Sequence, residues 1–103
     1  MREMVIDGDF MVTKDLMYAH LSRLFSFPTH FGNNLDALWD VLNECVEPTT
    51  VEFTHVEAVV EHLGAYGEKL VALFHKLNDE HECYTVHFYN GNIKPDRENI
   101  KDE

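Results

Sequence analysis

The sequence predicts an α/β fold in which a small three-stranded parallel sheet is packed with about four helices. Three short runs, residues 4–6, 49–53 and 83–89, are rich in β-forming side chains. The long stretches between them carry apolar residues at helical spacing. Strands separated by long helical connections cannot pair as hairpins, so they are expected to enter one sheet in parallel through right-handed crossovers.

The first apolar run, residues 4–6, is closed by an Asp-Gly-Asp sequence, as in a buried strand or in the first arm of a hairpin returning through residues 10–12. The single strand is favoured, because Thr13 is placed to start a helix and leaves little room for a second strand. Residues 26–31, which include Pro28, are expected to end this helix and form a connector, and Gly32 is expected to permit the turn into the next helix.

The second half of the chain continues the alternation of strands and helices. Residues 49–53 alternate β-formers and are interpreted as a strand. Thr54 and Glu57 have the spacing of a capping box, so a helix is expected after Thr54, and Gly64 is placed to stop it. Another helix is expected from Gly67, before the last strand.

The length of 103 residues suits one domain with a modest core, expected at residues 1–89. Residues 90–103 have few apolar side chains, mixed charge and a proline, so a flexible polar tail is expected there.

The net charge of −11 argues against nucleic acid, anionic membrane or acidic substrates as direct partners, and favours a basic partner. No Lys or Arg lies between Arg23 and Lys69, whereas eight acidic residues do. The most strongly two-faced helix of the chain falls within this anionic half.

That helix is expected around residues 33–44, with Leu35, Leu38 and Leu42 on one stripe. Asp36, Asp40 and Glu44 follow each other at intervals of four on the opposite side, which stacks like charges along one line. A helix built only for stability would carry Lys there, although an acidic solvated face is also a common arrangement. Trp39 is expected at the seam between the two faces, as in many interface aromatics.

Cys45 and Cys83 are too few, and too far apart, to define a disulfide framework or a metal site by spacing, and both are expected to be reduced thiols. The N-terminus carries acidic residues where a signal peptide needs an apolar run, and no segment approaches transmembrane length. A cytoplasmic protein is therefore expected.

Motifs for catalysis or cofactor binding are not found in the sequence. The seven histidines include no H-x-x-x-H pair, and the chain has no glycine-rich phosphate loop after a strand and no G-x-S-x-G elbow. No metal, no cofactor and no enzymatic activity are expected. An acid–base or divalent-metal pair formed by Asp36 and Asp40, as in a carboxylate-dependent enzyme, is an alternative, because both project from one side of the helix.

Residues 27–40, Phe-Pro-Thr-His-Phe-Gly-Asn-Asn-Leu-Asp-Ala-Leu-Trp-Asp, resemble the signature of the barstar family, intracellular protein inhibitors of barnase-type ribonucleases. The likeness covers most of the chain, including the strand around Val5, the helix that contains Phe74, and Cys83 at the start of the last strand. The resemblance implies a parallel three-stranded sheet and a binding face made by the second helix and the loop before it.

The resemblance also implies roles for individual residues. Asp40 matches the aspartate that enters the nuclease active site as a phosphate mimic, and Asp36 matches one that pairs with basic groups at the rim. The implied partner is a basic, barnase-type ribonuclease bound one to one by an inhibitor or immunity protein that is monomeric when free. A non-inhibitory acidic interaction module with a basic partner is the second hypothesis. The candidate partner-binding residues are His30, Gly32, Asn34, Leu35, Asp36, Trp39, Asp40, Asn43, Glu44 and Lys76.

The sequence departs from the family pattern at the rim of this face. His30 stands where an aromatic residue is common, Glu44 replaces a glycine, Cys45 replaces a tryptophan, and Lys76 replaces an acidic residue that contacts the enzyme. The central acidic positions are kept, so the cognate nuclease need not be barnase itself. The bond between Glu47 and Pro48 matches a cis bond in the family, but the loop is one residue shorter and its isomer is left open.

Overall fold

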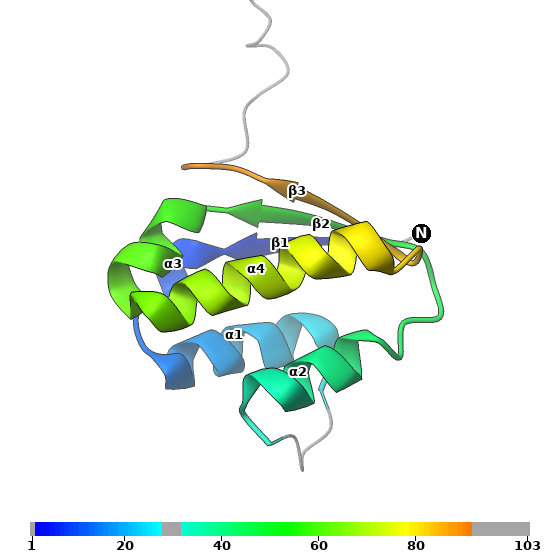
Figure 1. The fold of residues 1–103 in the computed structure, drawn as a ribbon, viewed down its shortest axis with the longest axis horizontal. Helices are drawn as coiled ribbons and strands as arrows, with labels where there is room; N and C mark the ends of the chain where they lie inside the picture. The colour runs from blue at the N-terminus through cyan, green and yellow to red at the C-terminus, as the bar shows by residue number, and fades with distance from the viewer. Residues whose placement is uncertain (1, 28–31, 92–103) are drawn as a thin grey trace, which may run out of the picture.

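The computed structural model of the protein describes residues 2–27 and 32–91, and its three strands form one parallel sheet (Figure 1). The strands are β1 (Arg2–Asp7), β2 (Thr49–Thr54) and β3 (Tyr84–Phe88), in the order β1-β2-β3. Val51 in the central strand lies opposite Met4 of β1 and Val86 of β3. The predicted fold class is confirmed.

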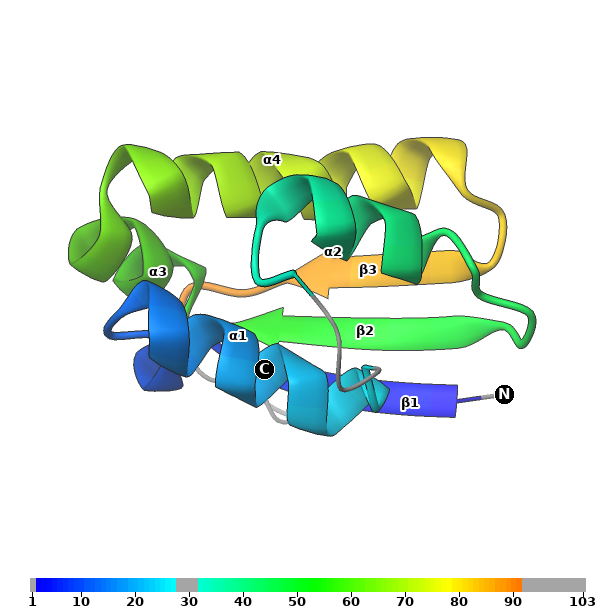
Figure 2. The same cartoon turned by 90° about the horizontal axis from the view of Figure 1, so that it is seen from below.

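The helices follow the predicted order. They are α1 (Lys14–Phe25), α2 (Leu35–Leu42), α3 (Val56–Leu63) and α4 (Ala65–Glu80), and a short 3-10 turn, η1 (Gly8–Phe10), follows β1. Helices α1, α2 and α4 lie on the same face of the sheet, and α2 lies outermost, between α1 and α4 (Figures 1 and 2). No helix in the described parts of the chain has the length and apolar character needed to cross a membrane.

The core lies between the helices and that one face of the sheet. Alternate strand residues point into it, so Ile6, Val51 and Phe53 are fully buried, while Val5 and His87 on the other face are exposed. Parallel sheets are usually covered on both faces, and the open face here is largely polar. The largest fully buried side chains are Phe53, Phe74, Ile6, Met11, Met17, Leu21, Leu38, Leu42, Leu70, Leu77, Val51 and Val59.

The start of α1 is confirmed, and the helix ends before residue 26, as predicted. The Thr13 side chain accepts a hydrogen bond from the Leu16 N–H at 3.2 Å, and no hairpin arm forms after β1. The helix ends at Phe25, followed by Ser26 in the left-handed conformation with φ of 55°. The helix therefore stops before Pro28, which lies outside the described residues together with the rest of 28–31.

The predicted capping box at the start of α3 is wrong. Thr54 is the last residue of β2, and its buried hydroxyl donates to the carbonyl of Ile6 in the neighbouring strand at 3.0 Å. His55, with φ of 53°, precedes the helix without a side-chain cap. Glu57 instead accepts a hydrogen bond from the Gly91 N–H at 2.9 Å, which lowers the pKa of the Glu57 carboxyl. Strand β2 is one residue longer than predicted, and the Thr54 hydroxyl that would cap α3 is bonded to β1 instead.

Gly64 ends α3 as predicted, with φ of 59°, and α4 begins directly after it, two residues earlier than Gly67. Gly67 lies buried in the first turn of α4, where a Cβ would collide with the carbonyl oxygen of Val59. The predicted polar tail, apart from Asn90 and Gly91, lies outside the described residues.

The prediction of two reduced thiols is wrong, because Cys45 and Cys83 form a disulfide with their Cα atoms 6.3 Å apart. Neighbouring parallel strands begin at the same end of a sheet, so the segments that lead into β2 and β3 are brought together across 38 positions of sequence. The peptide bond between Glu47 and Pro48 is trans, unlike the cis bond that the family resemblance offers as a possibility.

Candidate functional site

Helix α2 begins with a side-chain cap supplied by Asn34. Its Oδ1 accepts a hydrogen bond from the Ala37 N–H at 2.7 Å, and its Nδ2 donates to the Gly32 carbonyl at 3.3 Å. The left-handed residue in this turn is Asn33, with φ of 51°, so the turn does not depend on Gly32 in the way the sequence suggested. The cap fixes the direction in which the helix leaves the loop.

The two faces of α2 are divided as predicted. Leu38 and Leu42 are buried in the core, while Asp36 and Asp40 are exposed. Asp36 lies in the first turn, where the helix dipole favours negative charge. Within residues 2–27 and 32–91, neither carboxylate takes part in an ion pair, and Lys76 does not neutralise Asp40.

Glu44 does not extend this row of carboxylates along the helix. Helix α2 ends at Leu42, and Asn43 caps it by donating from Nδ2 to the Trp39 carbonyl at 2.7 Å. Glu44 follows in a turn in which its N–H donates to the Val41 carbonyl at 3.1 Å. Two carboxylates of the predicted three therefore project from the helix, and the third lies beyond its end.

A groove of about 320 Å³ runs between α2 and α4, and we call it the α2–α4 groove. Lys76 Nζ lies 5.1 Å from the centroid of the Trp39 ring, a cation–π distance that places a positive charge beside the acidic helix. Trp39 is half-buried, in agreement with its predicted position at the seam. The groove is lined by Leu35, Asp36, Trp39, Ala72, Leu73 and Lys76.

Four of the ten predicted partner-binding residues line the α2–α4 groove: Leu35, Asp36, Trp39 and Lys76. Gly32 and Asn34 lie at the start of α2 and are exposed, and Asn43 is exposed at its opposite end, next to Glu44. His30 lies outside the described residues.

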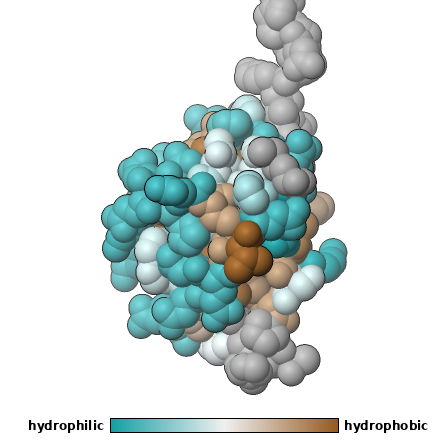
Figure 3. All heavy atoms as spheres, turned by 90° about the vertical axis from the view of Figure 1, so that its right-hand side faces the viewer, coloured by the Kyte–Doolittle hydropathy of each residue, from teal (hydrophilic) through white to brown (hydrophobic). Residues whose placement is uncertain are grey.

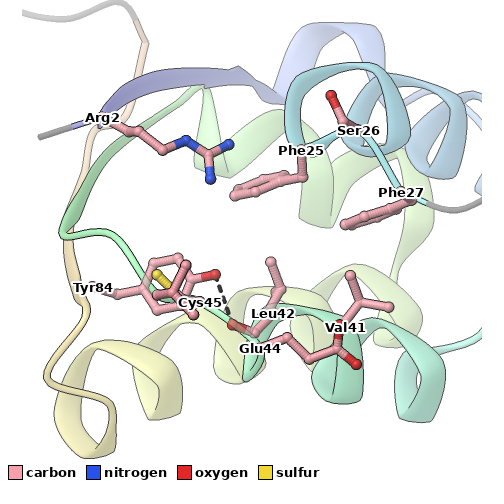
Figure 4. Close-up of a pocket in the computed structure, with 10 residues that line it drawn as sticks. Arg2, Phe25, Ser26, Phe27, Val41, Leu42, Glu44, Cys45 and Tyr84 are labelled. Carbon is pink, nitrogen blue, oxygen red and sulfur yellow. Dashed lines mark hydrogen bonds between the residues drawn. The ribbon is translucent and has the colours of Figure 1, made fainter.

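A second cavity, of about 210 Å³, lies behind the C-terminal end of α2 (Figure 4). Figure 3 views this end of the molecule, where apolar side chains interrupt a mostly hydrophilic surface. The Tyr84 hydroxyl in this cavity donates to the Leu42 carbonyl at 2.7 Å, and burial raises the pKa of Tyr84 to about 12. This cavity leaves no pattern in the sequence, because its walls come from separate elements. They are formed by Arg2, Phe25, Ser26, Phe27, Val41, Leu42, Glu44, Cys45, Val46 and Tyr84.

One group of side chains in the described part of the chain has the donor types of a metal site. Ligand atoms of Asp7, Asp9 and His55 lie within 4.8 Å of one another, at the C-terminal ends of β1 and β2. Asp36 and Asp40, considered as a metal pair from the sequence, have no third His, Cys, Asp or Glu ligand within such reach among the described residues.

Comparison with known proteins agrees with this architecture. The family model described as Barstar (barnase inhibitor) matches residues 1–90. The chain is also similar to a Bacillus subtilis (strain 168) protein named "Putative ribonuclease inhibitor YrdF", with 31% identity over 81 residues, which are 78% of this chain and 89% of that protein. Barstar family members are inhibitors and not enzymes. The match over most of the chain, together with the parallel sheet, establishes that this protein belongs to the barstar family.

Proposed function

We propose that this protein inhibits a basic, barnase-like ribonuclease by placing the carboxylates of α2 in its active site as phosphate mimics. Asp40 is the residue that enters the site, and Asp36 pairs with basic groups at the rim. The observation that carries the proposal is that both carboxylates are exposed, without an ion partner among the described residues, on a helix that is capped and anchored in the core.

A ribonuclease must hold the phosphates of its substrate with cationic groups. A carboxylate on a rigid helix can bind those groups without being hydrolysed, and little ordering entropy is lost because the helix is already formed. The repulsion between Asp36 and Asp40 in the free protein is relieved when both meet cations. Relief of this repulsion therefore contributes to the free energy of binding.

The remaining surface around α2 supports recognition of one particular enzyme. Lys76 adds a positive charge beside Trp39, so the partner surface opposite this point is expected to carry an anionic or neutral group. The other proposed contacts are His30, Gly32, Asn34, Leu35, Asn43 and Glu44.

The proposed complex contains one inhibitor and one nuclease, and the free inhibitor is a monomer that contacts neither nucleic acid nor membrane. Its proposed place is the cytoplasm, where it would protect cellular RNA against the cell's own nuclease or, as an immunity protein, against a delivered one. Residues 1–89 are expected to be sufficient for inhibition.

The test is titration of a barnase-like ribonuclease with the wild-type protein and with Asp40→Asn, which removes one charge with little change of shape. Loss of one partner from a buried ion pair costs about 3–5 kcal/mol, so D40N should bind at least a hundredfold more weakly. Glu61→Gln is the matched control, because it neutralises an exposed carboxylate on α3 and should inhibit normally.

Three results would count against the proposal in different ways. Equal inhibition by the wild type and D40N would remove Asp40 from the site. Binding of a basic partner without inhibition would favour the alternative of an acidic interaction module. Failure to bind any basic ribonuclease would reject both the nuclease and the phosphate-mimic mechanism.

A further inference from the structure

The C-terminal end of α2 is fastened to the turn formed by residues 81–84, which leads into β3. Helix α2 has eight residues, which is too short for stability in isolation. Among the described residues, no helix or strand packs its backbone closely along α2 in the way that α4 packs along α3. Three links make the connection: Tyr84 to the Leu42 carbonyl at 2.7 Å, His81 Nε2 to the Asn43 carbonyl at 3.2 Å, and the disulfide between Cys83 and Cys45.

The two hydrogen bonds have defined donors. The Cys83 N–H donates to His81 Nδ1 at 3.2 Å, so His81 carries its proton on Nε2 and donates it to the Asn43 carbonyl. The Tyr84 hydroxyl is kept protonated, because burial raises its pKa to about 12. The disulfide is therefore the one link of the three that a change in redox conditions would open.

The position of these links connects them to the acidic face. Asp40 lies within one helical turn of two anchor points on the α2 side, Leu42 and Asn43, and the third, Cys45, follows just beyond the end of the helix. The N-terminal half of α2 is held by its own cap and by packing of Leu35 and Leu38 in the core. The covalent restraint on α2 therefore acts at the C-terminal end of the helix, the end nearer to Asp40.

We propose that the Cys45–Cys83 disulfide positions α2 reversibly, so that the oxidised protein binds its nuclease more tightly than the reduced protein. This inference rests on the proposed function, because α2 must be the binding helix. Both cysteines are half-buried, so a small dithiol can reach them. A dithiol such as dithiothreitol attacks one sulfur and then closes to its own cyclic disulfide; two electrons and two protons convert the bridge into two thiols.

Reduction should loosen the helix without unfolding the domain. The Glu47 carbonyl lies 3.1 Å from Cys45 Sγ and 3.0 Å from Cys83 Sγ, so it can accept a hydrogen bond from a thiol once the bridge is open. The Tyr84 and His81 links remain. We expect reduction to weaken nuclease binding about tenfold, mostly through faster dissociation, because the helix must then be ordered on binding.

Hydrogen exchange on the free protein tests the positioning independently of any nuclease. Dithiothreitol should raise the exchange rates of the amides in residues 38–43 about tenfold, while the amides of α4 should keep their protection. Cys45→Ser combined with Cys83→Ser should match the reduced protein and should not respond to dithiothreitol. Unchanged exchange in α2 would overturn the proposal, because the bridge would then not restrain the helix. An equal increase in every element would also overturn it, because the bridge would then stabilise the whole domain.

Inhibition is then measured for the oxidised, reduced and double-serine proteins. Weaker inhibition by the last two, with normal circular dichroism, supports the proposal, whereas equal inhibition by all three rejects it. Tyr84→Phe keeps the ring and removes the second link, so it should raise the sensitivity of α2 to reduction. If the oxidised wild type inhibits no ribonuclease, the proposed function fails, and the exchange data alone decide whether the bridge positions α2.

Discussion

Asp36 and Asp40 project from the same exposed side of α2, one helical turn apart, and neither forms an ion pair with another described residue. Like charges at this spacing destabilise a helix, so Asp40→Asn should raise the free energy of unfolding by a few tenths of a kcal/mol. Asp36→Asn should gain less, because Asp36 also interacts with the positive end of the helix dipole. Urea unfolding of the free proteins measures both. A loss of stability in D40N would mean that Asp40 has a structural partner.

The cap of α2 can be tested at Asn34. Asn34→Ala removes the acceptor of the Ala37 N–H and should lower the free energy of unfolding by about 1 kcal/mol. Asn34→Asp keeps an acceptor in the same place and should stay within a few tenths of a kcal/mol of the wild type. Thermal and urea unfolding give the comparison, and equal values for the two variants would show that the hydrogen bond contributes nothing.

Lys76 is expected to select the partner. Lys76→Glu reverses the charge beside Trp39 and should weaken binding of the cognate nuclease about tenfold or more, or about 1.4 kcal/mol, if the partner is not cationic at this point. Lys76→Met keeps most of the apolar stem and should cost less, because it removes attraction without adding repulsion. Affinities measured at two salt concentrations separate the charge effect from packing. Tighter binding by K76E would place a cation on the partner instead.

His20 should make stability depend on pH. Its Nε2 accepts a hydrogen bond from the Asp7 N–H at 3.0 Å, and burial, with a contribution from Arg23, lowers its pKa below the ordinary 6.5. A lowered pKa in the folded state means that the unfolded chain binds the proton more readily. This contribution to stability is therefore present above pH 6.5 and is lost as the pH falls toward the folded-state pKa.

The variant His20→Gln keeps a possible acceptor and does not titrate, so its stability should decline less between pH 7.5 and pH 5.5 than that of the wild type. Urea unfolding at several pH values provides the measurement. His62→Gln, at an exposed position on α3, is the control and should leave the decline in place. An unchanged pH profile in H20Q would contradict the assignment.

Gly67 is required by the packing of α3 against α4. Alanine is the better helix former, yet Gly67→Ala should destabilise the domain by about 1–3 kcal/mol, because its Cβ would collide with the Val59 carbonyl oxygen. Gly64→Ala meets no atom within 4 Å, and its cost should reflect only the positive φ of 59°. Calorimetry of both variants tests this, and a stabilised G67A would show that the two helices can separate at little cost.

Most elements of the fold could be predicted from the sequence because their signals are local. The β-prone runs, the cap at Thr13, the stop at Gly64 and the two faces of α2 depend on residues within a few positions of one another. The disulfide could not be predicted in this way, since Cys45 and Cys83 meet only after β2 and β3 pair.

The local errors have the same origin. Thr54 has the spacing of a cap, but the neighbouring strand takes its hydroxyl. Glu44 has the spacing of the next helical position, but α2 has already ended. The residues of the proposed site were predicted through a family signature, whereas the Tyr84 link behind α2 joins positions 42 apart and leaves no pattern in the sequence.

The sheet has its helices on one face (Figure 1). Polar side chains such as Glu52 and His87 lie on the other face, with the Glu52 carboxylate 3.3 Å from His87 Nδ1. The described part of the molecule therefore has two layers, and the proposed binding face lies in the helical layer. Substitutions on the outer side of the strand layer can change the net charge and solubility without touching either the core or α2. Solubility and partner choice can therefore be changed by separate substitutions, on opposite sides of this domain.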